Sequence, residues 1–529
     1  MLFDILTTVE IAEDAGYDLV VLGGGAAAFA AITEASERGL ETAIVNTGLP
    51  LGGTCVNVGC VPSKHLLEVE QAAFEPPRNP FGAVKYNEEP TVDWASALDE
   101  KDRLVGQLRD ENYVDVADSF GTDVYEGYGR FADSEARSRS RAEGSRDDET
   151  LRVSNHVSNN RTNSSEGTTI EVIDGADAGA RVAGEKVLVA TGSSPSPAPI
   201  DGLRQIDYET SESILERRTL PDSMVVIGGG YIALKWGQIL HHVGVDVPML
   251  QRSDHVLSGM ERQLGREIER CFREEGIEIV TDIDVQRVGQ ENAVATDGGL
   301  EAIEAGVVET DVDGERRKFA GEDLFVATGV APNSEGIGLD SVGIETDESG
   351  AIVVDECFQT THPNVYGAGD VIGEPELETV AAKEGNHAVE NAFRNEGRTI
   401  DYDAVPKVVF TSPEVAAVGI TEAEYVDDHG ACACRTVDMA DVPKAKAVED
   451  TRGLLQVVKH HETDTIVGVH MVGPRTADMI PAATLAVKLG LTVDDVIDTV
   501  HSFLIFSEAL RQACQAFRRD TETMSCCIE

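Results

Sequence analysis

The chain has 529 residues, of which 41% are hydrophobic, so it is long enough for two to four domains with sizeable cores. Its 95 acidic residues against 43 basic ones give a formal net charge of −52, which excludes a nucleic-acid-binding protein because phosphates would be repelled. The acids are spread along the chain, and such a charge destabilises a compact state unless salt screens it, which predicts a cytoplasmic protein of a salt-accumulating, halophile-like organism.

The cysteine count and the apolar runs exclude two further classes. Nine cysteines in a long chain do not suggest the disulfide framework of a small secreted protein. No signal peptide precedes the first expected strand, and no apolar run reaches the roughly 18 residues of a membrane span. We therefore expect neither secretion nor a membrane partner.

The first expected strand, residues 17–22 (YDLVVL), leads into the run GGGAAA at residues 23–28. This is GxGxxA between a strand and a helix, where glycines allow a tight turn and close approach of a pyrophosphate to a helix N-terminus. The next strand, residues 42–45, ends at Asn46, where an acid that binds ribose is expected. Asparagine can accept the hydrogen bond but lacks the charge. The pattern predicts a dinucleotide site that includes Gly23, Gly25, Ala28 and Asn46.

The segment GGTCVNVGCVPSK at residues 52–64 places Cys55 and Cys60 five positions apart. A regular helix would separate them by about 7.5 Å along its axis, more than the usual Cα separation in a disulfide. The turn must therefore be distorted, which Gly53 and Gly59 permit. A nearby helix N-terminus and a lysine one turn on are expected to lower the pKa of a cysteine. Two buried structural cysteines are the alternative reading, which the coincidence of spacing, glycines and the Pro-Ser-Lys end disfavours.

The middle of the first half contains an expected helix, a strand and an insertion. Residues 91–118 are acidic and favour a helix, and residues 121–131 favour a strand. Residues 134–169 are rich in Ser, Arg, Asn, Asp and Glu and poor in large apolar residues, which predicts a surface insertion or disordered loop. A strand at residues 186–189 then leads to Thr191 and Gly192.

A second dinucleotide unit follows. An expected strand at residues 224–227 precedes GGGYIA at residues 228–233, again GxGxxA, and a helix that runs to residue 242. The next strand, residues 245–250, is followed by Arg252, and an arginine here suits a 2′-phosphate and so favours NADPH over NADH. The unit ends with FVATG at residues 325–329. Two such units indicate two dinucleotides that meet.

The last third changes pattern. NVYGAGD at residues 364–370 precedes an expected helix at residues 378–394. From residue 402 the segments VPKVVFTSPEVAAVG, TRGLLQVVK and IVGVHMVG suggest antiparallel strands, followed by amphipathic helices at residues 477–489 and 492–500.

Taken together, these motifs resemble the flavin-dependent pyridine nucleotide-disulfide oxidoreductases, through almost the whole chain. The resemblance implies an α/β fold with two Rossmann-like domains, for FAD and NAD(P), and an α+β C-terminal dimerisation domain. It implies a homodimer with active sites shared across the interface. The expected domains are an FAD domain at 1–220, an NADPH domain at 221–335, a central segment completing the FAD domain at 336–400, and the dimerisation domain at 401–529.

The resemblance also assigns residues and the cofactors FAD and NADPH. Cys55 and Cys60 correspond to the redox-active disulfide, with Cys60 next to the flavin and Cys55 exchanging with substrate. Lys235 departs from the family, which usually has glutamate there. The further residues that the resemblance implies for cofactor binding or catalysis are Gly53, Thr54, Lys64, Thr191, Gly192, Gly228, Gly230, Tyr231, Arg252, Gly329, Gly369 and Asp370.

The C-terminal segment bears on the substrate. Disulfide reductases of this family place a histidine before Ser/Thr-Glu as an acid–base catalyst, and here Glu508 remains but Phe503 occupies the histidine position. A phenylalanine cannot transfer protons, so disulfide substrates are disfavoured. His501, two residues upstream, is read as a structural or surface histidine.

The chain ends in MSCCIE, and Cys526 and Cys527 are soft thiols suited to capturing a soft metal ion and passing it on. A terminal Cys-Cys resembles the mercuric reductases of this family, which implies Hg(II) as substrate, delivered by the tail of the partner subunit to Cys55 and Cys60. The alternatives are a thioredoxin reductase-like or dihydrolipoyl dehydrogenase-like disulfide reductase, and a thiol flavoprotein that only sequesters soft metals.

Overall fold

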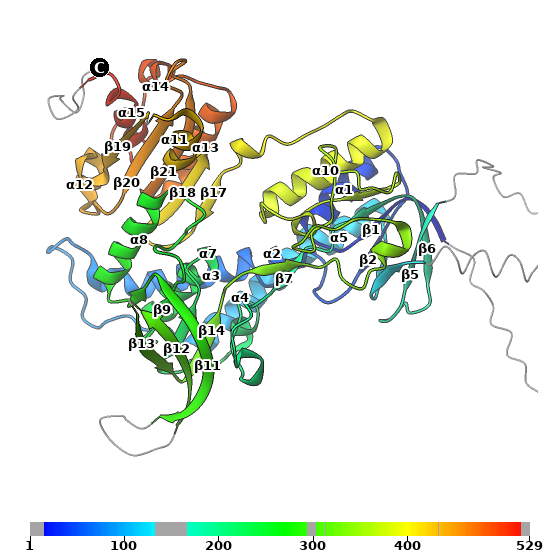
Figure 1. Cartoon of the computed structure of the whole chain (residues 1–529), viewed down its shortest axis with the longest axis horizontal. Helices are drawn as coiled ribbons and strands as arrows, with labels where there is room; N and C mark the ends of the chain where they lie inside the picture. The colour runs from blue at the N-terminus through cyan, green and yellow to red at the C-terminus, as the bar shows by residue number, and fades with distance from the viewer. Residues whose placement is uncertain (1–14, 133–166, 294–302, 313, 432, 520–529) are drawn as a thin grey trace, which may run out of the picture. The chain divides into compact units, whose positions relative to one another are not determined.

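The computed structural model describes residues 15–132, 167–293, 303–312, 314–431 and 433–519 (Figure 1). The chain forms two compact units. Unit 1 comprises Met1–Val61, Arg103–Ser194 and Val330–Ile400, and unit 2 comprises Pro62–Asp102, Pro195–Gly329 and Asp401–Glu529. Cys526 and Cys527, which were predicted to deliver the metal ion, and residues 134–166 of the predicted insertion lie outside the described residues.

Unit 1 is built on a seven-stranded sheet. The order is β3-β2-β1-β6-β5-β4, and β16 pairs with β6 beyond the point where β5 ends. Four pairs are parallel, namely β1–β2, β1–β6, β2–β3 and β6–β16. Strand β5 pairs antiparallel with both β4 and β6. The strands are β1 (Ala15–Leu22), β2 (Thr42–Asn46), β3 (Asp123–Glu126), β4 (Gly129–Phe131), β5 (Thr168–Val172), β6 (Arg181–Val189) and β16 (Val365–Gly367).

Helices α1 (Ala26–Glu37) and α10 (Glu378–Arg394) pack against each other in unit 1, as Figure 1 shows. The approach is close because Gly385 has no side chain. A Cβ there would lie 2.1 Å from the carbonyl oxygen of Ala27. The alanines of α1 fill the core between this helix pair and the sheet. The small-residue helix expected after the first glycine-rich loop is therefore confirmed as a packing element.

Unit 2 contains a four-stranded parallel sheet, a three-stranded antiparallel sheet and a five-stranded antiparallel sheet. The parallel sheet has the order β10-β9-β8-β14, from β8 (Met224–Ile227), β9 (Met249–Leu250), β10 (Ile279–Val280) and β14 (Asp323–Val326). The three-stranded sheet consists of β11 (Ile283–Ala293), β12 (Ile303–Val312) and β13 (Glu315–Gly321).

The five-stranded sheet has the order β17-β18-β21-β20-β19, and every pairing in it is antiparallel. Three C-terminal helices pack on it around one apolar core. The antiparallel character expected from residue 402 onward is confirmed. The elements are β17 (Lys407–Val409), β18 (Glu414–Gly419), β19 (Cys434–Asp438), β20 (Leu454–Lys459), β21 (Ile466–Gly473), α13 (Thr476–Lys488), α14 (Val493–Asp498) and α15 (Glu508–Gln515).

The remaining elements are the other helices, two short strands and single turns. They are α2 (Gly53–Asn57), α3 (Cys60–Phe74), α4 (Trp94–Arg109), α5 (Asp115–Phe120), α7 (Tyr231–His242), α8 (Arg262–Glu275), α9 (Leu339–Val342), α11 (Glu422–His429), α12 (Pro443–Val448), β7 (Ser193–Pro195), β15 (Val330–Pro332), a π-helical turn at Asp110–Val114, and 3₁₀ turns at Pro76–Arg78, Leu203–Gln205, Ser213–Glu216, Asp370–Ile372, Tyr402–Ala404 and Met439–Asp441.

Two expectations about elements were wrong in part. The strand expected at residues 245–250 is reduced to Met249–Leu250, because Pro248 lacks the N–H that a ladder needs. The insertion expected at 134–169 ends earlier, since Thr168 and Thr169 are buried residues of β5.

Helices α3 and α7 of unit 2 are joined by two polar contacts. Lys235 Nζ donates to Ser63 Oγ at 2.8 Å, and His242 Nδ1 lies 2.5 Å from Glu70 Oε2. The contacts are seven positions apart on each helix, so the helices run in the same direction. His242 Nε2 also lies 3.2 Å from Glu275 Oε2, which in turn belongs to an ion pair with Arg452.

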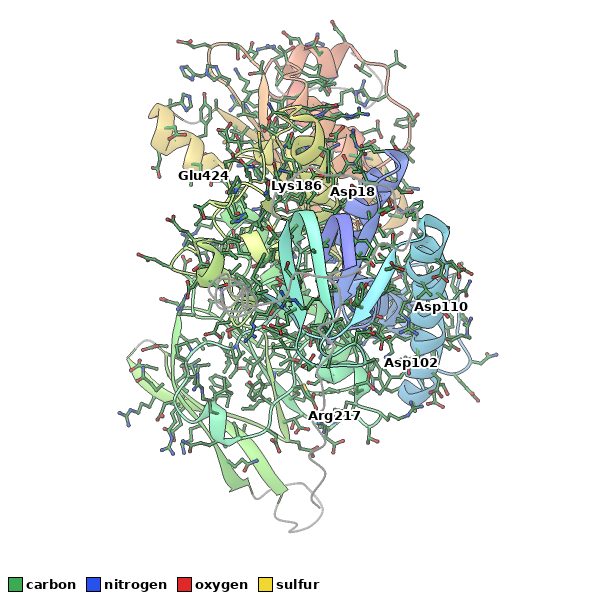
Figure 2. The ribbon with its side chains drawn as sticks, turned by 90° about the vertical axis from the view of Figure 1, so that its right-hand side faces the viewer. Asp18, Asp102, Asp110, Lys186, Arg217 and Glu424 are labelled. Atoms are coloured by element: carbon green, nitrogen blue, oxygen red, sulfur yellow. The ribbon has the colours of Figure 1, made fainter. Side chains whose placement is uncertain are left out.

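The negative charge is distributed over the fold. The acids labelled in Figure 2 belong to different elements: Asp18 to β1, Asp102 to α4 and Asp110 to the π-helical turn. No helix among the described residues is both long and apolar enough to cross a membrane.

Candidate redox site

Cys55 and Cys60 both belong to unit 1 and lie on either side of a break between helices α2 and α3. Helix α2 ends at Asn57, the next residue Val58 leaves the helical region with a φ of −136°, and α3 begins at Cys60. Gly59 between them is required by space, because a Cβ there would lie 2.8 Å from the carbonyl oxygen of Thr54. Gly53 has a φ of +59°, where glycine is favoured. The distortion expected from the spacing is therefore present.

This break brings the two sulfur atoms together. Neither cysteine is part of a disulfide, both are partly buried, and their Sγ atoms lie within 4.8 Å of each other and of a carboxylate oxygen of Glu378. A pair of thiols this close can bind one soft ion or close to a disulfide after a small movement.

The pKa expectation for this turn is corrected at Cys55. The hydrogen bond with Cys60 is the largest cause that raises the pKa of the Cys55 thiol, and burial and the Glu378 carboxylate act in the same direction. The helix N-terminus does not outweigh these effects, because a second negative charge beside a thiolate and a carboxylate is costly. In the reduced state Cys55 therefore holds its proton.

Two residues beside the dithiol were missed by the sequence reasoning. Glu378 is the first residue of α10, and its carboxylate accepts a hydrogen bond from the Cys55 thiol. Tyr113 lies in the π-helical turn, and burial, followed by the charges of Glu378 and the two cysteines, raises its pKa to about 12. The π-helical turn that holds Tyr113 is a feature often found at functional sites, but it becomes visible only in the structure.

The first glycine-rich loop of unit 1 forms a cradle that a side chain would fill. Gly23 has a φ of +110°, and a Cβ there would meet the Ala190 carbonyl oxygen at 2.1 Å. Helix α1 begins at Ala26 with no side-chain cap at Gly25 and no acid in its first turn. Its N–H groups and positive dipole end therefore suit a phosphate, as FAD binding requires.

Asn46 lies at the end of β2 beside this loop. Its Nδ2 donates to the Leu49 carbonyl at 2.9 Å, and its Oδ1 lies 2.8 Å from the point where a Cβ on Gly24 would stand. The amide is thus oriented with its oxygen toward the loop, and an oxygen is what a ribose hydroxyl needs as acceptor. Ala28, one turn into α1, is fully buried and packs on the sheet.

The other positions predicted for FAD also lie in unit 1. Thr191 Oγ1 donates to the Asn333 carbonyl at 2.8 Å, and Gly192 follows with a φ of +70°. Asp370 accepts a hydrogen bond from Ser193 Oγ at 2.7 Å and opens a 3₁₀ turn after Gly369, whose φ is +77°. Thr54 belongs to α2, one residue before Cys55.

The second glycine-rich loop, in unit 2, repeats the cradle. Gly228 has a φ of +133°, and a Cβ there would meet the Ala327 carbonyl oxygen at 2.3 Å. A Cβ on Gly230 would meet nothing within 4 Å, and α7 begins after it without a side-chain cap. Tyr231, the first residue of α7, is 47% exposed. Gly329 has a φ of +150°, within the range that favours glycine.

The basic residues of unit 2 take different partners. Arg252 is exposed and forms no ion pair with the residues that the structure describes, so its guanidinium can meet a phosphate. Lys64 lies with its Nζ 4.1 Å from the ring centre of Phe410, and Lys235 bonds Ser63. Lys235 therefore joins α7 to α3.

Phe503 and Glu508 lie in the C-terminal part of unit 2. Phe503 is 60% exposed, whereas Glu508 is 2% exposed, and burial raises the pKa of its carboxyl group. His501 uses Nε2 in a 2.9 Å hydrogen bond with the Val496 carbonyl, which agrees with a structural role. Further apolar side chains of this part are also exposed, namely Leu485, Leu489, Val500 and Ile505.

Comparison with known protein families identifies two matching regions of the chain. Residues 17–385 match the pyridine nucleotide-disulphide oxidoreductase family, and residues 405–514 match its dimerisation domain. The chain belongs to this family. It is a flavoprotein oxidoreductase with a redox-active cysteine pair, and membership implies FAD and NAD(P)H as cofactors. The exposed apolar side chains near Phe503 fall in its dimerisation domain.

Three relatives illustrate the range of similarity. A mercuric reductase of Streptomyces lividans is 37% identical over 97% of this chain and 98% of its own, and one of Lysinibacillus sphaericus is 33% identical over 99% and 86%. A dihydrolipoyl dehydrogenase of Bacillus subtilis is 32% identical over 94% and 98%. The solved flavoprotein disulfide reductase RclA of Escherichia coli, as its Cu(II) complex, shares the fold, with a TM-score of 0.76 at 23% identity over 95% of this chain and 99% of that one.

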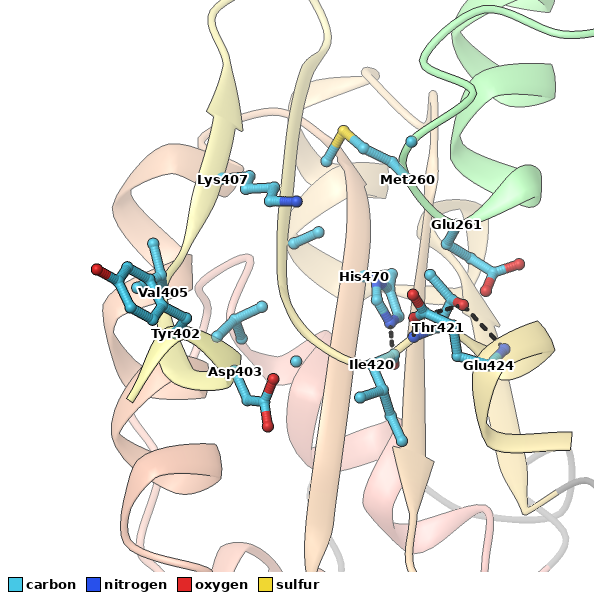
Figure 3. A pocket seen from close by; sticks show the side chains of 14 residues that line it. Met260, Glu261, Tyr402, Asp403, Val405, Lys407, Ile420, Thr421, Glu424 and His470 are labelled. Carbon is cyan, nitrogen blue, oxygen red and sulfur yellow. Dashed lines mark hydrogen bonds between the residues drawn. The ribbon is translucent and has the colours of Figure 1, made fainter. Parts of the chain in front are cut away.

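A separate cavity of about 180 Å³ lies in unit 2 and is lined by none of the predicted site residues (Figure 3). His470 there donates from Nε2 to the Ile420 carbonyl at 2.8 Å, and Thr421 and Glu424 form the N-terminal capping box of α11. These three side chains thus help to hold the local fold.

Proposed function

We propose that this chain is a mercuric reductase, which reduces Hg(II) to Hg(0) with electrons from NADPH. The observation that carries the proposal is the similarity to relatives of that name at 33% and 37% identity, each over at least 97% of this chain. The pair of thiols at Cys55 and Cys60 supplies the soft donors that Hg(II) requires.

The first glycine-rich loop and the start of α1 would hold FAD, which would supply the redox chemistry that links NADPH to the Cys55–Cys60 disulfide. Gly228 and Gly230 leave room for the pyrophosphate of NADPH, and Arg252 binds its 2′-phosphate. The reduced pair binds Hg(II), and the Cys55 thiol releases its proton. A second NADPH provides the two electrons that convert Hg(II) to Hg(0), so each metal ion consumes one NADPH and releases NADP⁺ and a proton. The metal leaves because the neutral atom has little affinity for thiolate.

Phe503 supports this substrate over a disulfide. Reduction of a disulfide has to deliver a proton to the leaving thiol, and a phenylalanine cannot do this. Release of Hg(0) requires no such proton. The same exposed ring belongs to the dimerisation domain, and we propose a homodimer in which Phe503 and Glu508 of one subunit face the dithiol of the other. Cys526 and Cys527 would deliver the ion.

The test measures NADPH oxidation and volatile mercury in parallel, in concentrated KCl, with and without HgCl₂. Cys55→Ser is expected to abolish both signals, while Cys357→Ser, at a free cysteine elsewhere in unit 1, is expected to retain them. Cys526→Ser with Cys527→Ser is expected to slow turnover at limiting metal.

The related dihydrolipoyl dehydrogenase makes a disulfide reductase the second candidate. NADPH or NADH oxidation driven by oxidised lipoamide or thioredoxin, with Hg(II) acting only as an inhibitor, would establish that function and refute the first. Tight binding of Hg(II) without NADPH oxidation would instead indicate a sequestering protein.

A further inference from the structure

The dithiol of unit 1 has a third donor. Among the residues that the structure describes, Cys55, Cys60 and Glu378 form the one group of three ligand side chains whose donor atoms all lie within 4.8 Å of one another. The carboxylate already accepts a hydrogen bond from the Cys55 thiol. It approaches from α10, a different element from the helices that carry the cysteines.

The spacing suits a tetrahedral ion. With Zn–S bonds of about 2.3 Å, two sulfurs of a tetrahedral site lie about 3.8 Å apart, and a carboxylate oxygen bonds at about 2.1 Å. Each pair of donors therefore has to close by roughly 1 Å at most, which side-chain rotation supplies. Glu378 is exposed and opens its helix, so its side chain is free to make this movement.

We propose that Glu378 is the third ligand of a Cys55–Cys60–Glu378 site that holds tetrahedral divalent cations, Zn²⁺ in particular, on the reduced dithiol. Two thiolates in line satisfy Hg²⁺, whereas Zn²⁺ requires further donors and accepts carboxylate oxygen. Binding releases the proton of the Cys55 thiol to solvent and moves no electrons, since Zn²⁺ has no redox chemistry here. The bound ion blocks the dithiol. This inference needs only the reduced cysteine pair and does not rest on mercury as the substrate.

Equilibrium dialysis of the NADPH-reduced holoenzyme against ZnCl₂ tests the site. Glu378→Gln keeps the shape of the side chain and removes the charged donor, and it is expected to raise the Kd for Zn²⁺ by about 10-fold or more. Glu374→Gln, at an exposed acid in the segment before α10, is the matched control and is expected to change the Kd less than about twofold. Glu378→Asp is expected to fall between the wild type and Glu378→Gln.

Flavin content and circular dichroism show whether each variant is folded. Equal affinity of wild type and Glu378→Gln would overturn the proposal, and so would an equal loss in both glutamine variants, because that would indicate a general charge effect. Inhibition of NADPH oxidation by Zn²⁺, reversed by a chelator, should follow the same order of variants. If Hg(II) fails as a substrate but Zn²⁺ binding still depends on Glu378, the proposed function falls and this site stands.

Discussion

At the scale of single residues, environment decides the chemistry. Glu70 is completely buried beside His242, and burial raises the pKa of its carboxyl group to about 7. Burial alone would lower the pKa of His242, but its hydrogen bonds with Glu275 and Glu70 outweigh that effect and raise it. The pair therefore binds more protons in the folded than in the unfolded chain at intermediate pH.

This excess of bound protons predicts a pH dependence of stability. The contribution of Glu70 is present in full below pH 4.5, the pKa of an ordinary glutamate, and is lost as pH rises through about 7. His242 acts in the same direction, because its folded-state pKa is also raised. Chemical denaturation between about pH 5 and 8 should show stability falling, and Glu70→Gln should flatten the curve. Parallel curves for the two proteins would contradict the expectation.

Arg252 predicts cofactor choice. A charge-assisted hydrogen bond to a phosphate contributes about 2 kcal/mol, which corresponds to about 30-fold in binding. Arg252→Ser should therefore lower kcat/KM for NADPH by between about 10-fold and 100-fold, measured by steady-state kinetics at constant salt. NADH, which lacks the 2′-phosphate, is the internal control and should change little. A similar loss with both cofactors would show that the arginine supports the fold instead.

At the scale of elements, glycine positions set how closely helices approach. Gly385 of α10 lies against the backbone of α1, where a Cβ has no room. Gly106 of α4 is also inside a helix, but a Cβ there would meet only a side-chain nitrogen of Arg109 at 3.9 Å. The same substitution should therefore have opposite effects at the two positions.

Gly385→Ala is expected to destabilise the protein by about 3 kcal/mol, because α1 and α10 must move apart or strain. Gly106→Ala is expected to stabilise it by up to about 1 kcal/mol, since alanine is the better helix former. Denaturant unfolding of both variants beside the wild type measures the difference. Equal effects would mean that the close contact of the two helices does not limit stability.

The elements also show what sequence can predict. The glycine-rich loops and the cysteine pair were recognised because their chemistry requires particular residues at short spacing. Glu378 and Tyr113 were not, since they reach the dithiol from distant parts of the chain and carry no local motif. The short strand after Pro248 follows from the sequence alone, because proline has no N–H to donate to a strand ladder. The pKa of Cys55 depended on neighbours that only the fold brings together.

At the scale of the whole molecule, the charge of −52 is the dominant property. Acids repel one another in the compact state, and at about 1 M salt the Debye length of about 3 Å removes most of this repulsion. The thermal unfolding midpoint should therefore fall steeply when KCl is lowered from about 2 M to about 0.1 M. Sucrose at matched water activity should not replace the salt, because it does not screen charge. A midpoint independent of KCl would refute the halophilic interpretation.

The two polar contacts between α3 and α7 limit which segments of this enzyme can be exchanged with those of its relatives. A chimera that takes the segment containing α7 from another protein would replace His242. The fully buried Glu70 carboxyl group would then lose its hydrogen-bond partner. Exchange should succeed only when α3, the helix that begins at Cys60, is transplanted together with α7. In a chimeric protein, both helices therefore have to come from the same parent.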